Sequence, residues 1–133
     1  MLAVVDTNIW VSAFLSPGGT PAKLLTEFKR GRLALMVCEE IEAEYREVLY
    51  RPQFKISVSL LDAFLQRVRE ESLRVRSLPK IDLSLPDPDD AVFIAVAKAA
   101  NCPIVTGNAR HFPAAAGVEI LSPAECIERL FKA

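Results

Sequence analysis

The sequence is poor in cysteine, histidine and long apolar runs. Its three cysteines are odd in number and widely spaced, which argues against a disulfide framework or a cysteine-rich zinc site and favours the reducing cytoplasm. With a single histidine, no serine or cysteine has a histidine at a spacing that suggests nucleophilic catalysis. The opening apolar run covers only residues 2–5, which is too short for a signal peptide or a membrane span, so we expect no membrane association.

The two signs of charge are nearly balanced, with 16 Lys and Arg against 17 Asp and Glu and a net charge of −1. No global positive field therefore marks the chain as a nucleic-acid binder, although a local basic surface is compatible with this composition. Apolar residues make up 51% of the 133 residues, which is enough for a substantial core. We expect a single domain that spans residues 1–133.

Short apolar runs alternate with stretches of helical periodicity along the chain. The predicted strands cover residues 2–5, 33–37, 75–78, 103–106 and 118–121. The predicted helices cover residues 9–15, 20–30, 38–50, 57–74, 88–101 and 123–131. Such alternation produces βαβ units with right-handed crossovers. The sequence therefore predicts an α/β fold, namely a three-layer α/β/α sandwich around a central parallel sheet.

The first predicted strand ends on a carboxylate. Asp6 follows the apolar run, and Thr7 and Asn8 come directly after it. Ligands of open α/β sheets bind in the crevice outside the carboxyl ends of the strands, so Asp6 is placed to contact a ligand. Because Asp also favours the position that begins a helix, a purely structural capping role explains Asp6 equally well at this point.

Two further acids and an amide can reach the same edge of the sheet. Glu44 borders the apolar stripe of the helix after the second strand. Asp90 lies in the first turn of the helix before the strand 103–106, and Asn108 follows that strand. Crowded carboxylates repel one another unless a hard cation lies among them, and Mg²⁺ and Mn²⁺ prefer oxygen ligands. The alternative for Asp90 is structural, because an acid in a first turn stabilises the helix dipole by about 0.3–1 kcal/mol.

Four segments, taken in order, resemble the motifs of PIN domains. They are Val-Val-Asp-Thr-Asn at 4–8, Glu-Ile-Glu-Ala-Glu-Tyr-Arg-Glu-Val-Leu at 40–49, Asp-Asp-Ala-Val-Phe-Ile-Ala-Val-Ala at 89–97 and Ile-Val-Thr-Gly-Asn-Ala-Arg-His-Phe at 104–112. The resemblance extends from residue 1 to about residue 121 and keeps the motif order of the family. The chain looks most similar to the small prokaryotic PIN proteins of toxin–antitoxin pairs, the VapC-like toxins.

The resemblance implies an endoribonuclease that uses Mg²⁺ or Mn²⁺ to hydrolyse RNA phosphodiester bonds. The implied metal ligands are Asp6, Glu44 and Asp90. The residues that would orient these ligands through hydrogen bonds are Thr7, Asn8 and Thr106. The chain departs from the family at the fourth catalytic position, where Asn108 stands and many members have Asp. Three negative charges instead of four favour one firm metal site over two.

The choice of Glu44 among the acids of its helix rests on the resemblance, because periodicity does not decide it. The other glutamates of this helix are expected on a solvated face and are Glu39, Glu40, Glu42 and Glu47. Thr106 also fits an ordinary strand residue.

RNA binding needs positive charge near the acidic edge of the sheet. The cations in segments that can rim this edge are Lys23, Arg46, Arg51, Lys55 and Arg110. A second basic set, expected at the surface or in a partner interface, consists of Arg67, Arg69, Arg74 and Arg76. The resemblance also implies a homodimer and a cognate antitoxin that docks against the helix 57–74.

Two other classes of function remain open at this stage. One is a catalytically silent PIN-like binding module, which the uncharged Asn108 makes conceivable. The other is an aspartate-based phosphatase or phosphotransfer domain, which also places an Asp after the first strand. That second class requires a lysine at a late strand end, and the run Ile104-Val105-Thr106-Gly107 contains none.

Overall fold

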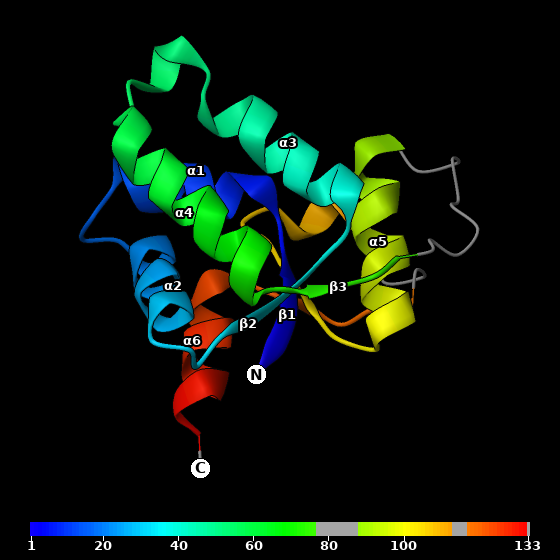
Figure 1. Cartoon of the computed structure of the whole chain (residues 1–133). Coiled ribbons are helices and arrows are strands. Elements are labelled where there is room, and N and C mark those ends of the chain that lie inside the picture. The colour runs from blue at the N-terminus through cyan, green and yellow to red at the C-terminus, as the bar shows by residue number, and fades with distance from the viewer. Residues whose placement is uncertain (77–87, 113–116, 133) are drawn as a thin grey trace.

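A computed structural model of the chain describes residues 1–76, 88–112 and 117–132 (Figure 1). In chain order the elements are β1 (Leu2–Val5), α1 (Thr7–Leu15), α2 (Thr20–Lys29), β2 (Ala34–Val37), α3 (Glu39–Leu49), η1 (Pro52–Phe54), α4 (Val58–Glu71), β3 (Leu73–Arg74), α5 (Pro88–Ala100), β4 (Ile104–Val105), η2 (Ala109–His111), β5 (Ile120–Leu121) and α6 (Pro123–Phe131). Among these described helices, none is long and apolar enough to cross a membrane.

The strands of the described residues form one five-stranded sheet in the order β3-β2-β1-β4-β5, and every neighbouring pair is parallel. β1 lies at the centre, and its residues Ala3, Val4 and Val5 are fully buried. This burial on both faces explains why the strand is an unbroken apolar run rather than an alternating one. The pairing of β1 with β4 matches Val5 to Val105, so the chain leaves both strands at the same level.

Helices cover both faces of the sheet and produce the predicted three-layer α/β/α sandwich. α5 packs against β1, β2 and β4, whereas α4 packs against β2 from the opposite side (Figure 1). α1 packs on α2 and α3, and α6 packs on α2 and β5. The predicted fold class is therefore confirmed.

Two features of the loops and caps explain where helices begin and end. Gly31 adopts a φ of 80° just after α2, a left-handed conformation that glycine adopts without steric cost. At the start of α6, the Ser122 side chain accepts a hydrogen bond from the amide of Glu125, and the Glu125 carboxylate accepts one from the amide of Ser122. This reciprocal pair is a capping box, and it fixes the helix start.

The prediction for the third strand is wrong in position. The helix expected to continue to residue 74 ends at Glu71, and β3 follows at Leu73–Arg74 instead of at residues 75–78. Residues 75 and 76 lie outside any strand, and residues 77 and 78 fall outside the described part of the chain. The cause is the position of β3 at the sheet edge: its two residues are both exposed, so no buried apolar run marks it in the sequence.

An aromatic cluster fills the core between α1, α2, α3 and α4. The fully buried Trp10 ring lies 5.0 Å from the Phe64 ring, 6.1 Å from Phe28 and 6.4 Å from Tyr45, measured between centroids. Aromatic pairs at these separations contribute to stability beyond the area that they bury. The cluster therefore fixes α3 relative to α1, the helix that begins directly after β1.

Candidate active site

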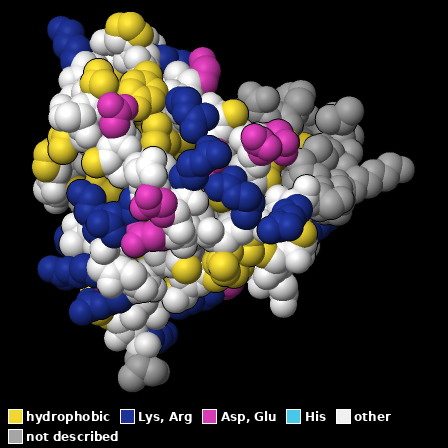
Figure 2. Space-filling model, in the orientation of Figure 1, with side chains coloured by type: hydrophobic (Ala, Val, Ile, Leu, Met, Phe, Trp, Pro, Cys, Tyr) yellow, Lys and Arg dark blue, Asp and Glu magenta, His cyan; other side chains and the backbone are white. Residues whose placement is uncertain are grey.

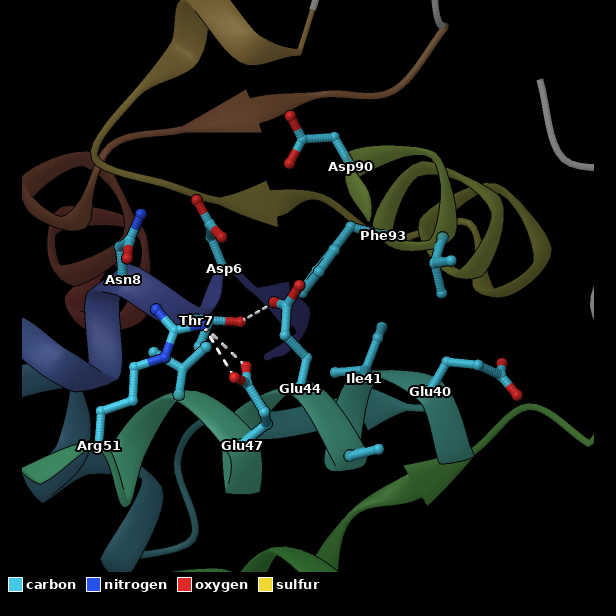
Figure 3. Close-up of a pocket in the computed structure, with 13 residues that line it drawn as sticks. Asp6, Thr7, Asn8, Glu40, Ile41, Glu44, Glu47, Arg51, Asp90 and Phe93 are labelled. Atoms are coloured by element: carbon cyan, nitrogen blue, oxygen red, sulfur yellow. Dashed lines mark hydrogen bonds and ion pairs between the residues drawn. The ribbon is translucent and has the colours of Figure 1, made fainter. Parts of the chain in front are cut away.

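A cavity of about 470 Å³ opens at the carboxyl end of β1 (Figure 3). Three segments line it: the junction between β1 and α1, one face of α3 with the residues after it, and the first turns of α5. The described lining consists of Asp6, Thr7, Asn8, Glu40, Ile41, Ala43, Glu44, Glu47, Val48, Arg51, Asp90, Val92 and Phe93. The three acids singled out in the sequence thus meet at one cavity, where ligands of parallel α/β sheets bind.

Asp6 stands at the N-cap position of α1, but within the described chain its side chain makes no capping hydrogen bond. Its carboxylate instead accepts a hydrogen bond of 2.8 Å from the Thr106 hydroxyl, at the end of the neighbouring strand β4. The Thr106 oxygen in turn accepts a hydrogen bond of 3.0 Å from the Asn108 amide. The Asn108 amide already donates to the Thr106 oxygen, so the hydroxyl proton of Thr106 points at Asp6. The capping alternative therefore does not explain where the Asp6 carboxylate is directed.

Burial separates these polar groups from ordinary surface residues. Asp6 is 9% exposed, Thr7 4% and Thr106 2%, although all three carry polar side chains. Burying a polar group costs free energy unless it is hydrogen-bonded, which is why the Thr106 hydroxyl and the Asp6 carboxylate occur as a pair. Thr106 therefore has a specific partner at this edge, beyond what a strand residue alone would require.

Glu44 reaches the cavity from α3 and is half-buried. The hydroxyl of Thr7 donates a hydrogen bond to Glu44 Oε2, which connects α3 to the first residue of α1 (Figure 3). Glu40 and Glu47 line the same cavity because residues four and three positions away lie on the same face of a helix. Both of them are exposed, and Glu47 pairs with Arg51 at 2.9 Å.

Asp90 lies in the first turn of α5, where it is 8% exposed. Figure 3 shows the Asp90 side chain extending from the start of α5 toward the side where Asp6 lies, and both residues line the cavity. A helix-dipole role does not by itself require an acid to be this buried, since such acids typically act at the exposed end of a helix. The position of Asp90 agrees with both roles, a dipole partner and a ligand at the cavity.

The donor chemistry of the cavity fits a hard divalent cation. Within the described residues, no group of three or more His, Cys, Asp or Glu side chains is arranged to hold a metal ion. Mg²⁺, however, usually takes only one or two carboxylates and keeps several waters. Asp6 and Asp90 are two buried acids that line one cavity, and this number of carboxylates agrees with such a site.

The remaining predicted site residues take different positions. Asn8 lines the cavity but is exposed, one residue beyond Thr7. Asn108 is exposed at the N-cap of η2 and acts on the site through its backbone amide on Thr106. In the described lining of the cavity, its side chain does not take part.

Of the predicted RNA-binding cations, the described chain places Arg51 in the cavity lining. Lys23 on α2, Arg46 on α3, Lys55 after η1 and Arg110 in η2 are exposed elsewhere. Figure 2 shows a further group of Lys and Arg side chains on the face that carries α4 and β3. The second basic set lies here: Arg67 and Arg69 are on α4, Arg74 is on β3, and Arg76 follows β3. One of its members, Arg74, is bound to an acid instead of being available to a partner.

That acid is Glu42, and its predicted solvated position is wrong. Glu42 is 5% exposed and forms an ion pair with Arg74. Its Oε1 accepts a hydrogen bond from the Arg74 guanidinium, with 2.5 Å between the nitrogen and the oxygen. The Glu42 carboxylate raises the pKa of the Arg74 guanidinium above its usual value. The pair connects α3 to the edge strand β3. The spacing of residues along α3 does not predict this ion pair.

The hydroxyl of Tyr45 makes a polar contact that the sequence did not predict. It donates a hydrogen bond to the carbonyl oxygen of Val5, the last residue of β1. Burial raises the pKa of this hydroxyl well above its usual range, with the nearby carboxylates of Asp6 and Glu44 adding to the effect, so the hydroxyl keeps its proton. The apolar stripe of α3 signalled that the ring would be buried, but no signal identified the partner of the hydroxyl.

Comparisons with known proteins show which proteins share this fold. The sequence model of the PIN domain matches residues 3–110. VapBC2 from Rickettsia felis, solved bound to a DNA fragment from its promoter, is 16% identical with a TM-score of 0.59 and coverage of 92% of this chain and 98% of that chain. PAE2754 from Pyrobaculum aerophilum is 18% identical, with a TM-score of 0.62 and coverage of 97% and 88%. FitAcB from Neisseria gonorrhoeae is 17% identical, with a TM-score of 0.54 and coverage of 93% and 99%.

No curated protein sequence matches the chain. At identities of 16–18%, the solved structures show a shared fold and leave the chemistry to be argued from the residues.

Proposed function

The chain belongs to the PIN domain family, and on that premise we propose that it is a Mg²⁺- or Mn²⁺-dependent endoribonuclease. Ribonuclease activity is typical of this family, and its members generally use divalent metals. The observation that carries the proposal is that Asp6 and Asp90, from two distant segments, are buried at one cavity with Glu44 in its wall. The substrate would be an RNA phosphodiester bond.

Asp6 and Asp90 would hold the cation, with Glu44 as a third acid at the site. When bound, the cation would stabilise charge on the phosphate and lower the pKa of an attacking water. Thr106 keeps the Asp6 carboxylate aimed at the cavity by donating to Oδ2, and Thr7 holds Glu44 Oε2 in the same way. Asn108 adds a neutral side chain at the position where an Asp would add a charge, so we propose one firm metal site.

The basic residues would contact the RNA backbone. Arg51 in the cavity lining is the cation best placed for a phosphate near the acids, and it would exchange its ion pair with Glu47 for that contact. We propose weaker, peripheral roles for Lys23, Arg46 and Arg110, which lie exposed on other elements.

We also propose that the protein is the toxin of a toxin–antitoxin pair, with a cognate antitoxin as its partner, a homodimeric state and a cytoplasmic location. The toxin role and the antitoxin partner are supported by the shared fold with VapBC2 from Rickettsia felis and with FitAB, each solved together with DNA. The homodimer and the location rest on the resemblance and the composition described above.

The proposal is tested by comparing the purified wild type with Asp6→Asn on structured RNA, in Mg²⁺, in Mn²⁺ and in EDTA. The wild type should cleave with either metal and stop in EDTA, and Asp6→Asn should lose more than about 100-fold, because even residues that only support a metal ligand cost about 10–100-fold when mutated. Asp62→Asn is the matched control, since Asp62 is exposed on α4 and accepts a hydrogen bond from Tyr50.

Equal cleavage by Asp6→Asn and the wild type would contradict the site assignment. Absence of cleavage by the wild type on a broad set of RNAs would favour the silent binding module. A phosphoaspartate that forms at Asp6 would instead support the phosphotransfer alternative.

A further inference from the structure

Two consecutive residues of α3 hold the two chain neighbours of Asp6. Tyr45 donates its hydroxyl proton to the carbonyl oxygen of Val5, and Thr7 donates its hydroxyl proton to Glu44. Val5 and Thr7 flank Asp6 directly in the chain. The backbone that carries Asp6 is therefore tethered to α3 on both of its sides.

The two tethers point in different directions from the helix. Successive residues of an α-helix are turned by about 100°, so Glu44 can face the cavity while Tyr45 faces the core. The Tyr45 ring is fully buried and meets the Trp10 ring edge to face, at 6.4 Å and 84°. The hydroxyl lies on the long axis of this buried ring, so the core that encloses the ring also sets the position of the hydroxyl oxygen.

We propose that Tyr45 is a positioning residue that sets the placement of Glu44 relative to Asp6. Its hydroxyl links α3 to the end of β1, and Glu44 and Asp6 stand on these two elements. This inference rests on the proposed function in so far as the acids hold a divalent cation. Tyr45 itself would touch neither the cation nor the RNA.

The test compares Tyr45→Phe with Tyr50→Phe, the only other tyrosine of the chain. Each substitution removes one hydroxyl that donates a hydrogen bond to an oxygen. The Tyr45 bond to Val5 is buried, whereas the Tyr50 bond to Asp62 is exposed. We expect Tyr45→Phe to weaken Mn²⁺ binding, measured by electron paramagnetic resonance, by about 3- to 10-fold, which corresponds to the net value of one hydrogen bond. The kcat for RNA should fall by a similar factor with KM unchanged, and Tyr50→Phe should match the wild type in both.

Amide hydrogen exchange gives a readout that needs neither metal nor RNA. The Asp6 amide donates to the Val105 carbonyl at 2.9 Å, and the Cys126 amide donates to the Ser122 carbonyl at 2.9 Å in the remote helix α6. In Tyr45→Phe, exchange should become faster at Asp6 and stay unchanged at Cys126. A residue that only contributed to global stability would speed exchange at both amides.

The outcomes separate the inference from the proposed function. If the wild type binds Mn²⁺, equal affinity in Tyr45→Phe overturns the positioning role, whatever the exchange rates. If the wild type binds no Mn²⁺, the proposed metal site fails, and the exchange comparison alone decides whether Tyr45 positions Asp6. In that case unchanged exchange at Asp6, or uniform acceleration at both amides, overturns the inference.

Discussion

Thr106 follows Asp6 by 100 positions in the chain, yet its Oγ1 lies 2.8 Å from Asp6 Oδ2 and donates a hydrogen bond to it. The parallel pairing of β1 with β4 brings the two residues together, because each comes directly after its strand. The bond is buried and aims the carboxylate at the cavity, so the sheet itself orients the central acid of the site.

Thr106→Val keeps the shape of the side chain and removes its hydroxyl. The buried Asp6 oxygen and the Asn108 amide would each lose a partner, so we expect the free energy of unfolding to fall by about 1–3 kcal/mol in urea titrations. RNA cleavage should fall by about 10- to 100-fold, as for other residues that orient metal ligands. Thr26→Val is the control, because Thr26 is exposed and the hydrogen bond of its hydroxyl, to the Ala22 carbonyl, lies within α2. Full activity of Thr106→Val would contradict an orienting role.

Arg74→Met should destabilise the protein by leaving the Glu42 carboxylate buried without its cation. The expected loss is about 1–3 kcal/mol of unfolding free energy, because Arg74 itself is partly exposed and the pair is not fully desolvated. The double variant Glu42→Leu/Arg74→Met should recover part of this loss, since an apolar pair leaves no buried charge. Arg67→Met, which breaks an exposed pair with Glu71, should cost at most about 1 kcal/mol. A double variant less stable than Arg74→Met would show that the uncompensated charge is not the cause.

The buried cysteines predict a loss of stability in alkali. Burial raises the pKa of both Cys38 and Cys126 from 9.0 to about 11. Between these values the folded thiols keep protons that the unfolded thiols release, so the free energy of unfolding falls as the pH rises from about 9 to 11. Urea titrations across this range should show a shallower decline for Cys38→Ala/Cys126→Ala than for the wild type. Parallel declines would assign the alkaline loss to other groups.

The order of strands and helices could be predicted because the central strands are buried apolar runs. β1 and β4 owe their position to buried apolar side chains, and α5, the helix that packs against both strands, is apolar for the same reason. β3 could not be placed, because a two-residue edge strand is selected by its pairing with Met36 and Val37 of β2 and not by its own composition. Local patterns carry no information about such a partner.

In the candidate site, too, some features could be predicted from the sequence and others could not. The places of Asp6 and Asp90, at a strand end and a helix start, could be predicted, and the topology brings both residues to one cavity. Hydrogen bonds between distant segments could not be predicted from spacing: Tyr45 finds Val5 40 positions away, and Glu42 finds Arg74 32 positions away. Helical periodicity told which side of α3 is buried, but not which polar atoms meet there.

The most direct measurement is a Mn²⁺ titration of four purified proteins, the wild type, Asp6→Asn, Asp90→Asn and the exposed control Asp62→Asn, followed by electron paramagnetic resonance. We predict one firmly bound Mn²⁺ per chain in the wild type and in Asp62→Asn, and a loss of that binding in both Asp6→Asn and Asp90→Asn. Equal Mn²⁺ affinity in all four proteins would contradict a metal site formed by these two acids.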